Sequence, residues 1–224
     1  MASEIDWAQQ AGTLEWVERY RNRTEAGNVL AGLLSDHAGE DALVLGIPRG
    51  GLPVARPIAE ALDAELGVVV AGKVGAPGNP EFAIGAVAPD GVTLIDEITV
   101  RRLGISRPQL EMAVERAIEK LRGRQEAYGA TDLQVADRTV IVVDDGVATG
   151  ATLQAALQYL RRLEPETLIC AIPVGPPATV ARLAADVDEM VCPRQPDHFR
   201  AVGEWYQEFS QVSDREVEAL LSGA

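Results

Sequence analysis

Residues 140–152 read Val-Ile-Val-Val-Asp-Asp-Gly-Val-Ala-Thr-Gly-Ala-Thr. The apolar residues 139–143 are typical of a buried strand, because strands that are covered on both faces are continuous apolar runs. Two adjacent acids follow the strand, and Gly146 allows a sharp turn. The small residues 149–152 stand where a helix over 150–162 is expected to begin. This stretch therefore predicts a strand, a tight loop and a helix.

The chemistry of this loop fits a sugar phosphate. Unpaired N–H groups at a helix N-terminus, together with the helix dipole, form a site for an anion, and the hydroxyls of Thr149 and Thr152 can add donors. Asp144 and Asp145 would repel an anion in direct contact, so we expect them to accept hydrogen bonds from a vicinal diol. A diol next to a phosphate describes ribose 5-phosphate. In the alternative interpretation, the acids and threonines only cap the helix.

Residues 140–152 resemble the phosphoribosyl pyrophosphate signature of type I phosphoribosyltransferases: an apolar strand, two acids and a Thr-Gly-x-Thr phosphate loop. The resemblance implies an α/β fold with an open, mainly parallel twisted sheet flanked by helices and a small hood region. It implies that Asp144 and Asp145 bind the ribose hydroxyls and contact Mg²⁺ only indirectly, through the ribose or water. The residues that it assigns to the 5-phosphate are Gly146, Val147, Ala148, Thr149, Gly150, Ala151 and Thr152.

From about residue 20 to 212 the chain also resembles a group of predicted phosphoribosyltransferases with no settled substrate, through segments 46–51, 73–81 and 201–206. One position departs from a known pattern. Family members that act on 6-oxopurines carry an acid immediately before the Thr-Gly pair, where this chain has Ala148. The departure weighs against hypoxanthine and guanine and is similar to the adenine and uracil patterns, without establishing either base.

A second loop follows the predicted strand 42–47, where the family has its pyrophosphate-binding loop. Its residues are Pro48, Arg49, Gly50 and Gly51. Two glycines let the backbone approach an anion closely, and Arg49 supplies a fixed cation with forked donors. The alternative is a plain strand-to-helix turn with an exposed arginine.

Residues 72–80 are rich in Gly and Pro and predict a loop, where the family has a mobile loop that closes over the reaction. Lys73, one of only two lysines, is a candidate pyrophosphate contact. Glu81 is a candidate general base, or an ordinary exposed glutamate.

The scarce aromatic residues gather near the C-terminus. Phe199, Trp205 and Tyr206 could form a hood on which a base stacks, since a π-face suits any planar heterocycle. They could equally plug the edge of a small domain, and the sequence leaves both interpretations open.

The apolar periodicity predicts alternating helices and strands, which is typical of βαβ units and an open parallel sheet. Predicted helices cover 13–36, 52–62, 106–127, 150–162 and 176–184, and a terminal helix follows Ser213. Predicted strands cover 42–47, 68–70, 83–87, 92–95, 139–143, 167–173 and 189–192. Ser106 with Gln109, and Ser213 with Glu216, have the spacing of capping boxes. We predict one domain over 1–224, with 106–127 as an amphipathic helical insertion and 193–224 as a C-terminal hood or tail.

The composition limits the class of protein. A net charge of −14 argues against a general nucleic-acid binder, which carries a basic face. No apolar run approaches the roughly 20 residues that cross a bilayer, and the acidic N-terminus does not read as a signal peptide, so we expect a cytoplasmic protein. The acid excess with few lysines predicts a halophile-like acidic surface. Cys170 and Cys192 are too few for a disulfide framework or a zinc site, and are expected as buried thiols.

These observations predict an enzyme. The expected reaction is a Mg²⁺-dependent transfer of the phosphoribosyl group from phosphoribosyl pyrophosphate to a nitrogen nucleophile of a small-molecule acceptor. One alternative is a sensor of the same fold that binds phosphoribosyl pyrophosphate or a nucleotide without chemistry. Another is hydrolysis or phosphorolysis at the same phosphate loop. The family resemblance also implies a possible homodimer.

Overall fold

The computed structural model describes residues 19–39, 41–130 and 133–222. Within these ranges, the strands form a five-stranded parallel sheet, with the order β2-β1-β6-β7-β8, and a three-stranded antiparallel sheet, with the order β3-β4-β5. The strands are β1 (Ala42–Gly46), β2 (Glu65–Val68), β3 (Gly72–Ala76), β4 (Asn79–Val87), β5 (Thr93–Ile95), β6 (Thr139–Val143), β7 (Thr167–Ala171) and β8 (Glu189–Val191). The helices are α2 (Arg23–Leu33), α3 (Leu52–Leu62), α4 (Glu97–Arg102), α5 (Arg107–Tyr128), α6 (Ala151–Arg161), α7 (Pro177–Ala184) and α8 (Asp214–Ser222).

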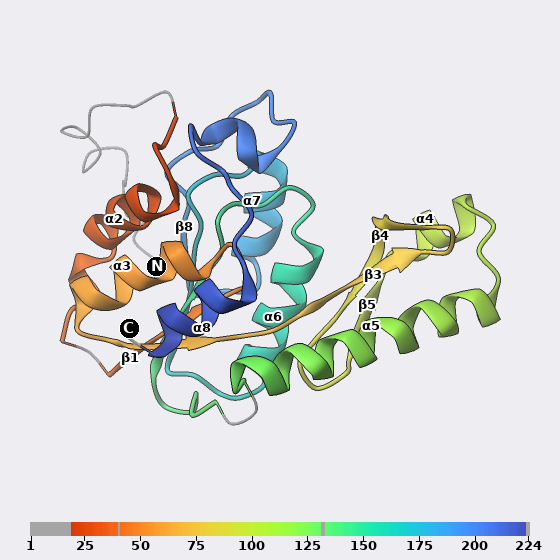
Figure 1. Cartoon of the computed structure of the whole chain (residues 1–224), viewed down its shortest axis with the longest axis horizontal. Helices are drawn as coiled ribbons and strands as arrows, with labels where there is room; N and C mark the ends of the chain where they lie inside the picture. Colours follow the sequence, from red (N-terminus) through yellow and green to blue (C-terminus); the bar gives the residue numbers. More distant parts are fainter. Residues whose placement is uncertain (1–18, 40, 131–132, 223–224) are drawn as a thin grey trace, which may run out of the picture.

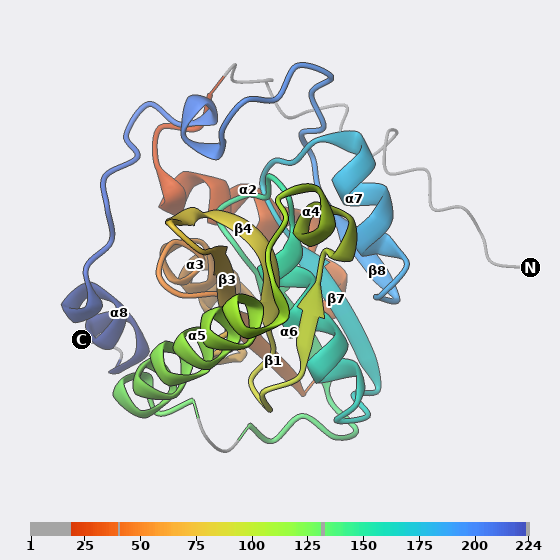
Figure 2. The same cartoon turned by 90° about the vertical axis from the view of Figure 1, so that its right-hand side faces the viewer.

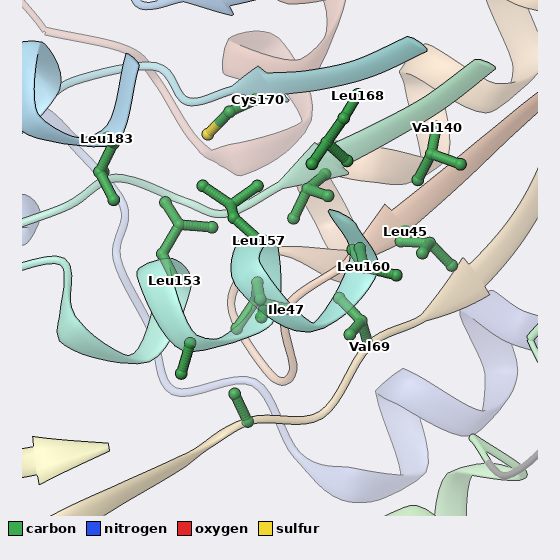
Figure 3. Packing of buried hydrophobic residues seen from close by; sticks show 14 of the residues in the cluster. Leu45, Ile47, Val69, Val140, Leu153, Leu157, Leu160, Leu168, Cys170 and Leu183 are labelled. Atoms are coloured by element: carbon green, nitrogen blue, oxygen red, sulfur yellow. The ribbon is translucent and has the colours of Figure 1, made fainter. Parts of the chain in front are cut away.

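Helices cover both faces of the parallel sheet (Figure 1). Successive side chains of a strand point to opposite faces, so Val44 of β1 and Ile141 of β6 pack with Leu30 of α2 and Ile58 of α3. On the other face, residues of β1, β6 and β7 pack against Leu157 of α6, as Figure 3 shows. The predicted open parallel sheet flanked by helices is confirmed.

The strand order reverses between β1 and β6, which are neighbours in the centre of the sheet. β2 lies on one side of this pair, and β7 and β8 follow on the other. In open α/β sheets a ligand binds beyond the carboxyl ends of the strands at such a switch point. The loops after Gly46 and Val143 are therefore where the fold favours a site.

The antiparallel strands and α5 form an arm that projects from the parallel sheet (Figures 1 and 2). Val74 and Ile84 of its two long strands pack against Ala117 and Leu121 of α5. Ser106 and Gln109 form the predicted capping box at the start of α5.

The structure corrects the expected loop over 72–80. These residues form most of a β-hairpin, in which β3 pairs with β4 and Pro77 and Gly78 make the turn. The glycines and prolines of this segment favoured a loop in the sequence-based prediction. The strands form because β5 and α5, from later in the chain, stabilise the pairing.

Two other boundaries differ. The helix expected over 13–36 begins at Arg23, because the Asn22 side chain caps it and Tyr20 forms a parallel bridge with Tyr206; residues 13–18 of that prediction lie outside the described ranges. The strand expected over 68–70 is β2, which ends at Val68 because its partner β1 ends at Gly46. The expected burial of Cys170 and Cys192 is confirmed. Among the described helices, none is both long and apolar enough to span a membrane.

Candidate functional site

The loops after β1 and β6 are in direct contact. The Ile47 N–H donates to the Val143 carbonyl (2.8 Å), which extends the alignment of the two strands beyond their last paired residues. A Cβ atom on Gly50 would lie 2.0 Å from Oδ2 of Asp145, so the carboxylate sits against the bare backbone of the β1 loop. The structure thus brings the two predicted loops together at the switch point.

Gly51 shows why the β1 loop is so tight. A Cβ atom there would lie 2.5 Å from the Val143 carbonyl oxygen and 2.6 Å from that of Ile47. Gly51 is also the N-cap residue of α3, so the helix begins directly at the edge of the sheet. The close approach places the N-terminus of α3 beside the end of β6.

Arg49 supplies the cation of this loop. Its Nη1 lies 3.9 Å from Oδ1 of Asp214 at the start of α8, and the Arg49 side chain is 31% exposed. The Tyr128 hydroxyl donates to the same carboxylate oxygen. The peptide bond between Pro48 and Arg49 is cis. Because the contact with Asp214 is long and partly exposed, the guanidinium is available to an anion at the loop.

The acid pair at the end of β6 is costly to ionise. Burial raises the pKa of Asp144 well above its ordinary value of 3.8, and the neighbouring charge of Asp145 adds to the rise. Burial also raises the pKa of Asp145, against the opposing effect of Arg23. The Asp145 N–H donates to Oδ1 of Asp144 (2.8 Å). Hydrogen-bond donors, such as the hydroxyls of a sugar, stabilise the ionised form of such buried carboxylates.

The loop that follows is arranged to present N–H groups. The Thr179 hydroxyl of α7 donates to the Ala148 carbonyl (2.9 Å), and the Arg182 side chain donates to the Thr149 carbonyl. Gly150 has φ +71° and precedes the first turn of α6, whose first internal bond runs from Gln154 to Gly150. The N–H groups of residues 151–153 precede that bond and have no acceptor within the helix. Such N–H groups, together with the helix dipole, favour an anion at this end of α6.

Lys73 and Glu81 lie in the arm and contact each other. Across the β3–β4 hairpin, the Lys73 Nζ is 2.9 Å from Oε2 of Glu81 and 3.1 Å from its carbonyl oxygen. The Lys73 side chain, through its hydrogen bond and charge, lowers the pKa of the exposed Glu81 carboxyl. A lowered pKa makes Glu81 a weaker base than an ordinary glutamate, so this arrangement speaks against a base role in the absence of rearrangement.

Of the predicted aromatic residues, Tyr206 is the best placed by its contacts. It is 3% exposed, and its ring centroid lies 5.6 Å from that of Tyr20 and 5.0 Å from that of Phe209. Its hydroxyl donates to the Asp145 carbonyl (2.6 Å). Trp205 packs partly buried in the same cluster. The burial and contacts of Tyr206 favour the interpretation that it closes an edge of the domain and does not stack on a base. Phe199 is half-buried in the loop that precedes Trp205 and Tyr206.

Sequence reasoning missed Arg23. Its Nε lies 2.8 Å from Oδ2 of Asp145, and the two side chains are only 11% and 14% exposed. Arg23 is one of 20 basic residues and stands 122 positions before its partner. The one available signal was its place directly after Asn22, a residue type that caps helices.

The site offers few protein ligands for a metal. Among the described residues, no group of three or more His, Cys, Asp or Glu side chains could hold a metal ion. Two carboxylates, those of Asp144 and Asp145, follow the end of β6 and would contact a bound Mg²⁺ only through water or the ribose. Such a pair fits Mg²⁺, which keeps several waters and takes further oxygens from substrate phosphates.

Comparison with known proteins shows which family the chain resembles. A family model described as a phosphoribosyl transferase domain matches residues 17–208. Two curated relatives, whose names assign them provisionally to the phosphoribosyl transferases, come from the CDC 1551 / Oshkosh and ATCC 25618 / H37Rv strains of Mycobacterium tuberculosis. Each is 39% identical over 207 residues, which are 92% of this chain and 47% of the relative. The chain therefore spans about half the length of the curated relatives it matches.

Solved structures resemble the chain as well. The TT1426 protein from Thermus thermophilus is 42% identical, with a TM-score of 0.74 over 91% of this chain and 97% of that one. The AQ2163 protein from Aquifex aeolicus is 14% identical, with a TM-score of 0.50 over 89% of this chain and 84% of that one, and shows a likeness of fold alone. The family model matches most of the chain, and the parallel sheet carries the expected loops at its strand ends. The chain therefore belongs to the type I phosphoribosyl transferase domain family.

Proposed function

We propose that this protein is a Mg²⁺-dependent phosphoribosyltransferase that moves the 5-phosphoribosyl group from phosphoribosyl pyrophosphate to a nitrogen nucleophile of a nucleobase or related heterocycle. The observation that carries the proposal is the contact between the two strand-end loops. The carboxylate of Asp145 lies against Gly50, and the N-terminus of α6 follows the same strand. One ligand with a diol between two anionic groups matches this arrangement.

The ligand is expected to lie along the switch point. Its 5-phosphate binds N–H groups within residues 148–152, because the Val147 N–H already donates to the Val174 carbonyl (2.9 Å). Its ribose hydroxyls donate to Asp144 and Asp145. Its pyrophosphate binds the loop of residues 48–51, where Arg49 neutralises negative charge. Bound Mg²⁺ would add charge neutralisation on the pyrophosphate, with the acid pair touching it through ribose or water.

The reaction exchanges one bond at the anomeric carbon of the ribose. A nitrogen lone pair of the acceptor forms a C–N bond while the C–O bond to pyrophosphate breaks, and the bonding electrons leave with the pyrophosphate. The nitrogen loses its proton to a base or to solvent. The protein contributes by holding the ribose in place and by neutralising the leaving group through Arg49.

A sensor of the same fold is the second candidate. The observation that favours it is the Lys73–Glu81 pair, because the two arm residues expected to act in transfer are bound to each other. The presence of Ala148 before the Thr-Gly pair also leaves the acceptor undefined.

Turnover separates these candidates. We expect pyrophosphate release from phosphoribosyl pyrophosphate in the presence of Mg²⁺ and one acceptor from a panel of purine and pyrimidine bases, with the nucleotide product identified by mass spectrometry. Arg49→Gln should lower the rate about tenfold or more, since it removes a charge-assisted contact to the leaving group. Arg21→Gln removes an exposed arginine and is the matched control.

Ribose 5-phosphate formed without an acceptor would indicate hydrolysis instead of transfer. Binding of phosphoribosyl pyrophosphate without turnover of any acceptor in the panel would favour the sensor.

A further inference from the structure

Arg23 makes a closely packed ion pair with the acid at the end of β6. It is the first residue of α2, and its Nε lies 2.8 Å from Oδ2 of Asp145. Both side chains are almost buried, with exposed fractions of 11% and 14%. In such a setting the geometry of a charged group is fixed by its neighbours, since water does not replace them.

The same oxygen of Asp145 is confined from a second direction. A Cβ atom on Gly50 would lie 2.0 Å from Oδ2 but 3.2 Å from Oδ1, so Oδ2 is the oxygen that rests against the β1 loop. Arg23 and Gly50 therefore hold one carboxylate oxygen between them. The carboxylate cannot turn freely, and Oδ1 is the oxygen left to accept from a ligand hydroxyl.

We propose that Arg23 is a positioning residue of the ribose site: it holds the Asp145 carboxylate against Gly50 so that Asp144 and the second oxygen of Asp145 meet the ribose hydroxyls. The inference rests on the proposed function and deepens it, because it assigns to an arginine from the N-terminal helix a part in recognising the diol. Fixing a binding group in its working geometry before the ligand arrives lowers the cost of binding.

Arg23 also connects this acid to the C-terminal strap, by which we mean residues 206–210. Its Nη1 donates to the Ser210 carbonyl (2.8 Å), and its Cζ lies 3.9 Å from the centroid of the Phe209 ring. The Tyr206 hydroxyl donates to the Asp145 carbonyl (2.6 Å). The strap therefore contacts the backbone carbonyl of Asp145, whereas Arg23 contacts its carboxylate. Segments from the N-terminal and C-terminal parts of the described chain thus hold the same acid.

A merely structural ion pair is the competing explanation. It would join α2 to the sheet, and its loss would change stability without changing which ligand the protein prefers. A positioning residue has a different signature, because its loss affects the ligand that carries the hydroxyl and spares one that lacks it.

The experiment uses calorimetric titration of the wild type, Arg23→Gln, Arg23→Lys and Arg21→Gln with three ligands in Mg²⁺ buffer: phosphoribosyl pyrophosphate, ribose 5-phosphate and 2,3-dideoxyribose 5-phosphate, which lacks both hydroxyls of the diol. We expect Arg23→Gln to weaken binding of the first two by about tenfold or more, and binding of the dideoxy sugar by less than about twofold. Arg23→Lys keeps the charge but not the forked donors, so its loss should be intermediate. Arg21→Gln, which removes an exposed partner of Glu25, should bind as the wild type does.

A double variant gives an independent readout. If Arg23 acts through Asp145, then Arg23→Gln added to Asp145→Asn should weaken binding of ribose 5-phosphate no further than Asp145→Asn alone. A full additional loss would overturn the proposal. An equal loss for the ribose and dideoxyribose ligands in a folded Arg23→Gln protein would overturn it as well, as would wild-type affinity. If Arg23→Gln does not fold, the same comparison in Arg23→Lys decides. Failure of the wild type to bind phosphoribosyl pyrophosphate is a different result, which would overturn the proposed function itself.

Discussion

Asparagine at position 144 is expected to weaken the binding of phosphoribosyl pyrophosphate and, at the same time, to raise the melting temperature of the ligand-free protein. The variant loses a charged acceptor for the ribose hydroxyls, which should cost about tenfold in affinity or more, about 1.4 kcal/mol or more. The gain in stability has a separate cause. Burial and the charge of Asp145 raise the pKa of Asp144, so the ionised acid is less favourable in the folded chain than in the unfolded one.

The pH dependence of this gain follows from the direction of the pKa shift. The folded wild type holds the Asp144 proton more strongly than the unfolded chain, whose carboxyl titrates near the ordinary value of 3.8. Wild-type stability therefore falls as pH rises from that value through the raised pKa, and Asp144→Asn lacks this loss. Melting curves from about pH 4 to about pH 8 should show a difference between variant and wild type that grows with pH. Asp36→Asn, which removes an exposed acid, is the control. A variant less stable than the wild type at neutral pH, or one with wild-type affinity, would contradict the assignment.

Alanine at position 50 is expected to reduce affinity for phosphoribosyl pyrophosphate about tenfold or more while the protein stays folded. The added Cβ would overlap the Asp145 carboxylate, at 2.0 Å from Oδ2 and 2.6 Å from Cγ. The Asp145 side chain must move away from the β1 loop and from Arg23, so its carboxylate is no longer placed to accept from the ribose hydroxyls. The backbone itself should tolerate alanine, because Gly50 is not among the positive-φ glycines of the described chain.

Calorimetric titration checks this prediction, with circular dichroism to confirm the fold. Gly32→Ala is the matched control, because a Cβ at Gly32 of α2 meets nothing within 4 Å. The control should bind as the wild type does. Wild-type affinity of Gly50→Ala would mean that the contact between the two loops has no part in ligand binding.

The parallel sheet and its helices were accessible from the sequence because local pattern and final environment agree there. The run over 139–143 is fully buried in β6, and α3 spans Leu52–Leu62 as the spacing of its apolar residues predicted. The capping box at Ser106 predicted the start of α5 for the same reason, since the hydrogen bond from the Ser106 N–H to the Gln109 side chain is local.

Features that depend on distant parts of the chain were not accessible. Residues 72–80, which form β3, the turn and the start of β4, were predicted as a loop, whereas the strand predicted over 83–87 lies within β4. The loop prediction failed because the hairpin is stabilised by packing on α5 and not by local β-propensity. Helix α4 was not predicted, although Asp96 caps it, because its six residues offer too short a period. The pair of Arg23 and Asp145 joins positions 122 residues apart, and no spacing rule connects them.

The candidate site was predicted in composition but not in arrangement. The residues of both strand-end loops were chosen from their chemistry, whereas their contact through Gly50 follows from the order of the strands. Which side chains share the site with them is decided by tertiary packing. Tyr206 lies buried under Asp145 for this reason, although its sequence context allowed a stacking surface just as well.

The central claim is that the loops after β1 and β6 together bind phosphoribosyl pyrophosphate. Its most direct test is a calorimetric titration of the wild type and Asp145→Asn with this ligand, with and without Mg²⁺, at low and high KCl. We expect saturable, Mg²⁺-dependent binding to the wild type that Asp145→Asn weakens about tenfold or more. No binding by the wild type under any of these conditions would contradict the account, and so would equal binding by the two proteins.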